Sequence, residues 1–225
     1  MNTLPVQTAR TFLIGALVLG ILLFLPAWTL AYWQAWVFIV VFMAAVSVIG
    51  VYLTLKDPAL LERRKKAGPA AEGSLAQKII MSLVILGFLA LLVFAALDHR
   101  FGWSRVSVGV SIAGDALVAL SFVIFYVVLR ENSYSGSTVQ TFEGQKVIST
   151  GPYALIRHPM YAGALVMIVG VALALGSWWA LAFLPFTILV LIWRILDEEQ
   201  LLKRDLPGYT EYTHNVRYRL VPHLW

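Results

Sequence analysis

Two short stretches in the C-terminal half of the chain carry side chains that can do chemistry at a membrane surface. The first, GPYALIRHPMYAG, places Arg157 and His158 directly before an apolar segment. The second, RILDEEQ, places Arg194 on the same helical face as Glu198, with Glu199 following. Guanidinium groups bind carboxylates and phosphates through paired hydrogen bonds, and carboxylates accept hydrogen bonds from ammonium groups. Together these residues suit a zwitterionic, water-soluble ligand beside an amphiphilic one.

Each stretch alone has a simpler interpretation. Arg157 is typical of a cation that obeys the positive-inside rule, and Pro159 after it is typical of a first helical turn. In the second stretch, Arg194 with Glu198 and Glu199 with Lys203 have the spacing of ion pairs on a solvated helix. The chemical interpretation therefore requires the two stretches to lie together in the fold.

Composition shows what kind of scaffold must bring them together. The chain is 60% hydrophobic and 13% charged, with a mean hydropathy of +0.81, which is typical of an integral membrane protein. It has no cysteine, which excludes disulfides, thiolate nucleophiles and cysteine-bound zinc. The sequence contains neither a G-x-S-x-G motif nor a phosphate-binding P-loop.

Unbroken hydrophobicity predicts an all-α transmembrane bundle of about six membrane helices. These run over Thr11–Tyr32, Ala35–Leu55, Ile79–Leu97, Val106–Leu129, Tyr161–Leu175 and Trp178–Leu196. The fifth is short and meets the sixth across Gly176–Ser177, which predicts a tight hairpin that returns the chain to the same membrane face. We expect one integral membrane domain over residues 1–225, with four spans in 1–130 and a catalytic region in 131–225.

The basic residues predict the orientation. Of the 17 Lys and Arg, only Arg100 and Arg105 fall in connections on one side, while the others, Arg10 included, fall in connections or span ends on the other side. Both termini are therefore predicted to face the cytoplasm, with a bacterial plasma membrane as the default location. The net charge of +5 is then a topology signal, and we expect membrane lipids rather than nucleic acid as partners.

The segments that connect the predicted spans differ in their expected roles. The segment ENSYSGSTVQTFEGQKVISTGPYALIRHPM is longer than a link between neighbouring helices needs and contains enough apolar residues to pack, so we expect it to be functional. The segment ERRKKAGPAAEG reads as an exposed cytoplasmic loop. Asp115 falls inside the fourth predicted span, where we expect it to have a buried hydrogen-bond partner. The histidines lack metal-ligand spacing, so no metal site is predicted.

The C-terminal motifs resemble those of a known enzyme group. GQKVISTGPYALIRHPMYAG, and then RILDEEQLLKRDLPGYTEYTHNVRYRLVP, are similar to the isoprenylcysteine carboxyl methyltransferase and phospholipid methyltransferase superfamily of membrane enzymes. The resemblance covers about the last 95 residues, from Arg130 to Trp225. It implies S-adenosyl-L-methionine as methyl donor, bound in a cytoplasm-facing pocket, and a membrane-embedded or lipid-like acceptor.

By motif position, the resemblance implies which residues hold the cofactor. They are Gln145, Lys146, Val147, Ile148, Tyr153, His158, Pro159, Met160, Tyr161 and Glu198, with Glu199 as a neighbouring alternative. Arg157 can supply a bidentate fork to a carboxylate, and Glu198 can accept from the ammonium group. Tyr153 or Tyr161 can offer an aromatic face to the sulfonium.

The acceptor stays open at this point. Arg194 is expected to orient a carboxylate, such as that of a prenylated group, or a phosphate; if the acceptor is an amine, Glu199 or His158 could take its proton. Two other functions are compatible with parts of the sequence. Membrane sterol reductases, which use NADPH, carry a related R-H-x-x-Y-x-G motif, although Ala164 after Gly163 departs from their pattern. A small transporter or lipid-binding membrane protein is the non-enzymatic alternative.

Overall fold

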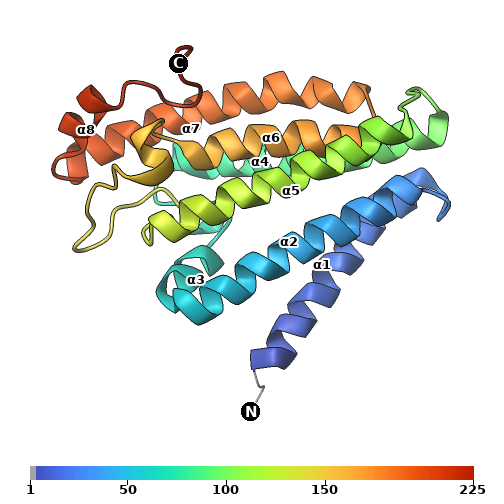
Figure 1. Cartoon of the computed structure of the whole chain (residues 1–225), viewed down its shortest axis with the longest axis horizontal. Helices are drawn as coiled ribbons and strands as arrows, with labels where there is room; N and C mark the ends of the chain where they lie inside the picture. The colour runs from blue at the N-terminus through green and yellow to red at the C-terminus, as the bar shows by residue number, and fades with distance from the viewer. Residues whose placement is uncertain (1–3) are drawn as a thin grey trace. The chain divides into compact units, whose positions relative to one another are not determined.

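The computed structural model describes residues 4–225, with side chains from Phe12 onward, and these residues form helices and irregular segments without a strand. Figure 1 shows the long helices. Their bounds are α1 Leu4–Ala27, α2 Trp33–Lys56, α4 Leu75–Phe101, α5 Val108–Glu131, α6 Pro159–Ala174 and α7 Phe183–Asp205. The short elements are α3 Pro58–Lys65, α8 Tyr209–Asn215 and the 3-10 turns η1 Pro69–Ala71, η2 Gly151–Ala154 and η3 Trp179–Ala182. The prediction of an all-α polytopic membrane protein is confirmed. The side chain of Arg10 lies outside the described residues.

The helices differ in their capacity to cross a bilayer. Among the residues that the structure describes, four segments are long and apolar enough: α2, α4, α5 and the continuous stretch Trp179–Asp205. The apolar parts Phe12–Ala27 of α1 and Pro159–Ala174 of α6 are shorter. At 1.5 Å per residue, the 16 residues of α6 span about 24 Å, less than the hydrocarbon core of about 30 Å.

Two predicted boundaries are wrong. The first predicted span reached Tyr32, but α1 ends at Ala27: Pro26 lies in its last turn and Trp28 adopts a positive φ of 58°. Apolar composition continues through this turn, so hydropathy alone could not locate it. The link between α6 and α7 is also longer than Gly176–Ser177, because residues 175–178 are irregular and η3 precedes α7.

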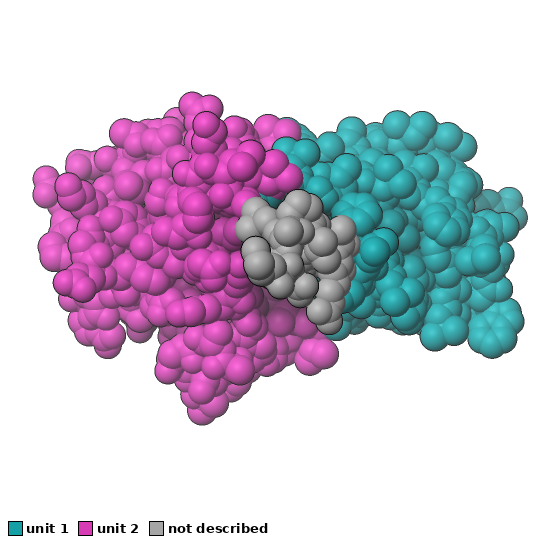
Figure 2. Space-filling model, turned by 90° about the horizontal axis from the view of Figure 1, so that it is seen from below, with its two compact units in different colours: residues 1–50, 87–122, 166–184 teal, residues 51–86, 123–165, 185–225 magenta. Residues whose placement is uncertain are grey.

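The described chain forms two compact units, coloured separately in Figure 2. One contains residues 1–50, 87–122 and 166–184, and the other contains residues 51–86, 123–165 and 185–225. Neither is a continuous stretch, because α2, α4, α5, α6 and α7 each contribute to both. The single integral membrane domain expected over 1–225 stays a prediction.

The first unit is held together by close helix packing and a few buried polar contacts. A Cβ on Gly114 of α5 would lie 2.2 Å from the backbone nitrogen of Ala174 in α6, and one on Gly170 would lie 2.8 Å from the nitrogen of Val118. Small residues thus let two apolar helices meet at backbone distance. In the same unit, Asp98 accepts from the backbone N–H of Ser104 at 2.7 Å.

The hydrogen bonding of Asp115 differs from the expectation. It is buried on α5, and neither carboxylate oxygen has a hydrogen-bond partner among the residues that the structure describes. The same holds for the hydroxyl of Ser111, one turn earlier. The expected partner of Asp115 is therefore not found among the described residues.

Candidate functional site

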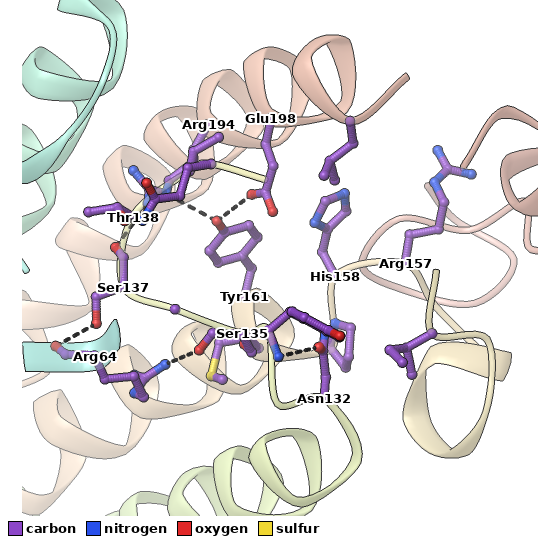
Figure 3. A pocket seen from close by; sticks show the side chains of 18 of the residues that line it. Arg64, Asn132, Ser135, Ser137, Thr138, Arg157, His158, Tyr161, Arg194 and Glu198 are labelled. Carbon is purple, nitrogen blue, oxygen red and sulfur yellow. Dashed lines mark hydrogen bonds between the residues drawn. The ribbon is translucent and has the colours of Figure 1, made fainter. Parts of the chain in front are cut away.

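The second unit encloses a cavity of about 490 Å³. Its wall combines the end of α3, the middle of α4, the irregular segment between α5 and α6, the start of α6, the polar half of α7, and α8. Figure 3 shows 18 of the side chains that line it. A cavity of this size falls in the range of small-molecule and cofactor sites.

A connected row of hydrogen bonds lies at the centre of the cavity wall, with Tyr161 as its middle member (Figure 3). The Nε of Arg194 donates to the Tyr161 hydroxyl at 3.0 Å. That hydroxyl in turn donates to the Oε2 of Glu198 at 2.6 Å. Arg194 and Glu198 stand one turn apart on α7, and Tyr161 faces both from the first turn of α6. The hairpin of α6 and α7 thus brings the two sequence stretches to one wall.

Two residues that the sequence analysis missed hold Arg194 in place. Its Nη1 donates to Glu72 at 3.0 Å and to the side-chain oxygen of Gln77 at 2.7 Å. Glu72 also accepts from the backbone N–H of Val139, in the segment over the cavity. Glu72 and Gln77 are both buried. Most of the segment ERRKKAGPAAEG is exposed, as expected from its composition, but its Glu72 is buried and its Arg64 is partly buried.

Arg157 and His158 meet a different carboxylate. Arg157 donates from Nε to the Oε1 of Glu199 at 2.8 Å, and the Nε2 of His158 lies 3.3 Å from the same oxygen. The Nη1 of Arg157 donates to the carbonyls of Val216 and Arg217 at 2.8 and 2.9 Å. The other Glu199 oxygen accepts from Arg219. This buried group joins α6, α7 and the C-terminal segment.

The structure brings most of the predicted site residues to the cavity. Those that line it are Arg157, Arg194, Gln145, Lys146, Val147, Ile148, Tyr153, His158, Pro159, Met160, Tyr161 and Glu198. Glu199 does not line it. The spacing of neighbouring acids on one helix explains this difference: residues 100° apart face different neighbours.

The segment between α5 and α6 is tied down at several points. Asn132 donates to the Tyr153 hydroxyl at 3.0 Å, and the Tyr212 hydroxyl donates to the Tyr153 carbonyl at 2.7 Å. Arg63 donates to the carbonyl of Ser133 at 2.6 Å, and its guanidinium lies 4.6 Å from the ring centre of Phe142. Burial raises the pKa of Tyr153, so its hydroxyl stays neutral at physiological pH.

Further lining residues were not assigned to the site from the sequence. Tyr209 and Tyr212 of α8 belong to the C-terminal stretch that carries the family resemblance, whereas the cation Arg64 of α3 and apolar side chains of α4 and α5 carried no signal. The apolar group consists of Met81, Val84, Ile85 and Phe125. One part of the wall is therefore polar and another is apolar, so the cavity can receive a polar ligand and a hydrocarbon chain together. No group of three acidic or histidine side chains able to hold a metal ion occurs among the described residues.

Comparisons with known proteins show similarity to a methyltransferase family and to a sterol reductase. Residues 110–206 match the family model of phospholipid methyltransferases, which lies within the superfamily named above, so the resemblance is confirmed for this part of the chain. The chain is also 31% identical, over 91 residues, to the mouse Delta(14)-sterol reductase TM7SF2. That match covers 39% of this chain and only 22% of the reductase, so it spans about a fifth of the relative's length.

Proposed function

Because residues 110–206 carry the phospholipid methyltransferase pattern, which indicates a membrane methyltransferase, we propose that the protein transfers a methyl group from S-adenosylmethionine to a lipid-like acceptor. The observation that carries the proposal is the carboxylate of Glu198. It lines the cavity, accepts from Tyr161, and has no cationic side chain paired with it among the described residues. An acceptor of hydrogen bonds in this state suits the ammonium group of an amino acid.

The other parts of the cavity suit the remainder of the donor. The ring of Tyr161 stacks against that of His158 with centroids 5.5 Å apart, and an aromatic ring in this position can attract a sulfonium. The irregular backbone of Gln145 to Ile148 offers N–H and C=O groups that can meet adenine edges. These residues therefore fit a nucleoside with an amino-acid tail.

The hydrogen-bond partners of Arg157 and Arg194 favour roles that differ from those expected from the sequence. Arg157 is bound to Glu199 and to two backbone carbonyls, so we assign it to positioning α6 rather than to binding the donor's carboxylate. Arg194 is neutralised by Glu72, and its effect on the cavity passes through the Tyr161 hydroxyl. Neither guanidinium offers an uncompensated charge to a ligand.

The bound donor would supply the methyl group, which would pass to the acceptor in one in-line displacement. Such a displacement requires no protein nucleophile. The chain's residues would contribute alignment and exclusion of water, which are worth about 7–11 kcal/mol in well-oriented cases. The apolar wall of Met81, Val84, Ile85 and Phe125 favours an acceptor that carries a hydrocarbon chain. Both a carboxylate and an amine on such a chain are compatible with this wall, and His158 could take the proton of an amine.

A second candidate function is reduction of a sterol-like substrate with NADPH, which the similarity to the mouse reductase favours. The two enzymes would differ in their soluble ligand. Bound nicotinamide is detected by its absorption and fluorescence, whereas methyl transfer releases S-adenosylhomocysteine. A lipid-binding protein without enzymatic activity would show neither signal.

Calorimetry on the detergent-purified protein tests the proposal. We expect S-adenosylmethionine to bind the wild type, and Glu198→Gln to weaken binding at least ten-fold, because a hydrogen bond to a charged group is worth about 1.5–3 kcal/mol. Glu211→Gln, an exposed acid on α8, is the matched control and should bind as the wild type does. Equal affinity in Glu198→Gln and Glu211→Gln would refute the role of Glu198.

The proposed activity also implies a location for the site in the cell. The excess of basic residues in connections on one side supports a cytoplasmic location of the cavity and both termini, where S-adenosylmethionine is available. A bacterial plasma membrane remains the default location, and membrane lipids supply the acceptor.

A further inference from the structure

The charges around the cavity separate into compensated and uncompensated groups. Arg157 is paired with Glu199, and Arg194 is paired with Glu72. Glu198 faces the cavity without a paired cation, as described above. Two cations also line the cavity without an ion pair among the described residues: Lys146, which is exposed, and Arg64 at the end of α3, which is partly buried.

Arg64 is a partly buried cation. Its Nη1 donates to the carbonyl of Ser135 at 3.0 Å, and its own carbonyl accepts from the hydroxyl of Ser137 at 3.1 Å. No acidic side chain of the described residues forms an ion pair with it. Burial lowers the pKa of its guanidinium, because partial loss of hydration disfavours the charged form.

The neighbouring cations of the same segment are in different states. Arg63 lies against aromatic rings and binds the Ser133 carbonyl, and Lys65 is exposed and pairs with Glu62. In Figure 3, Arg64 lies on the side of Tyr161 away from His158 and Arg157. Among the described residues, the cavity wall therefore carries the cations Arg64 and Lys146 and the carboxylate Glu198 without an ion pair.

We infer that Arg64 is the anion-binding residue of this cavity and binds an anionic oxygen group of its ligand. A guanidinium with one nitrogen held by a backbone carbonyl keeps other N–H donors for a carboxylate or phosphate. This inference rests on the proposed function in that it places a ligand in the cavity. Two sources share the required chemistry: the carboxylate of the methyl donor and the phosphate of a lipid headgroup.

Two binding measurements on the full-length, detergent-purified protein distinguish these sources. The first compares S-adenosylmethionine with its decarboxylated form, and the second uses a short-chain phosphatidic acid. If Arg64 binds the donor's carboxylate, Arg64→Gln should weaken S-adenosylmethionine binding about ten- to a hundred-fold and leave binding of the decarboxylated form unchanged. If it binds a lipid phosphate, the same variant should lose phosphatidic acid binding by a similar factor and keep donor binding.

Two further variants separate recognition from folding. Lys65→Gln removes an exposed charge from the same helix and should match the wild type with all three probes. Ser137→Ala removes a contact to the Arg64 backbone but leaves its guanidinium, so a purely structural role would make it resemble Arg64→Gln. Arg64→Lys keeps the positive charge but cannot form the paired hydrogen bonds of a guanidinium. We therefore expect an affinity for the anionic probe between those of the wild type and Arg64→Gln.

The outcomes are distinct from those for the proposed function. If the wild type binds the donor and Arg64→Gln changes neither donor binding nor phosphatidic acid binding, the inference is overturned. The methyltransferase proposal is then unaffected. Arg64-dependent binding of phosphatidic acid without any donor binding supports the inference and overturns that proposal. Failure of the wild type to bind any of the three probes overturns both.

Discussion

Glu72 and Arg194 form a buried ion pair at 3.0 Å across 122 positions of sequence. The pair joins the short segment before α4 to the middle of α7. Because the other Glu72 oxygen accepts from Val139, the same carboxylate also holds the segment that covers the cavity. One buried acid, outside the region that matches the methyltransferase family, thus determines where Arg194 and the cavity's cover lie.

The first prediction concerns this ion pair. Glu72→Ala should destabilise the protein by about 3–5 kcal/mol, because it leaves the Arg194 charge buried without a partner. The change can be followed as thermal unfolding in detergent. The double variant Glu72→Gln/Arg194→Gln should recover part of the loss, since no lone charge remains; a double variant less stable than the sum of the single changes would contradict this view.

The second prediction separates the two neighbouring acids of α7. Glu199→Gln should lower thermal stability, because Arg157 and Arg219 both lose their carboxylate partner. Glu198→Gln should leave the unfolding temperature within a few degrees of the wild type, because this carboxylate has no paired cation. Similar losses of stability in both variants would show that Glu198 is also a structural group.

The third prediction concerns the phenol in the row of hydrogen bonds. Tyr161→Phe keeps the ring but breaks the connection between Arg194 and Glu198. We expect donor affinity to change less than five-fold and the rate of methyl transfer to fall by about ten- to a hundred-fold, because Glu198 and Arg194 lose their common orientation. The measurement is release of S-adenosylhomocysteine at saturating donor, and an unchanged rate would exclude a positioning role for this hydroxyl.

The fourth prediction tests helix packing with two glycines of α5. Gly114→Ala places a methyl group 2.2 Å from the backbone of Ala174, so the helices must separate, at a cost of about 1–3 kcal/mol. Gly109→Ala meets nothing within 4 Å and should be neutral or stabilise the helix by about 0.5–1 kcal/mol. The unfolding temperature in detergent should therefore fall for Gly114→Ala and stay unchanged or rise for Gly109→Ala.

The sequence was sufficient where the determining property is local. Long apolar stretches determine the membrane helices, since a chain in lipid must satisfy its backbone hydrogen bonds internally. Most of the residues that the motifs indicated line the cavity, because Arg194 and Glu198 share a helical face and the α6–α7 hairpin is antiparallel. The turn at Trp28 was not predicted, because hydropathy carries no information about the backbone angle φ.

The partners of the charged residues were decided by tertiary structure alone. Local spacing allowed Glu199 to pair with Lys203, yet the fold buries it against Arg157, His158 and Arg219. Composition marked the segment of Glu72 and Arg64 as exposed, yet both residues contact the segment that covers the cavity. A buried charge must find its counter-charge in three dimensions, and the carboxylate that satisfies it can come from any part of the chain, so spacing along one helix cannot identify it.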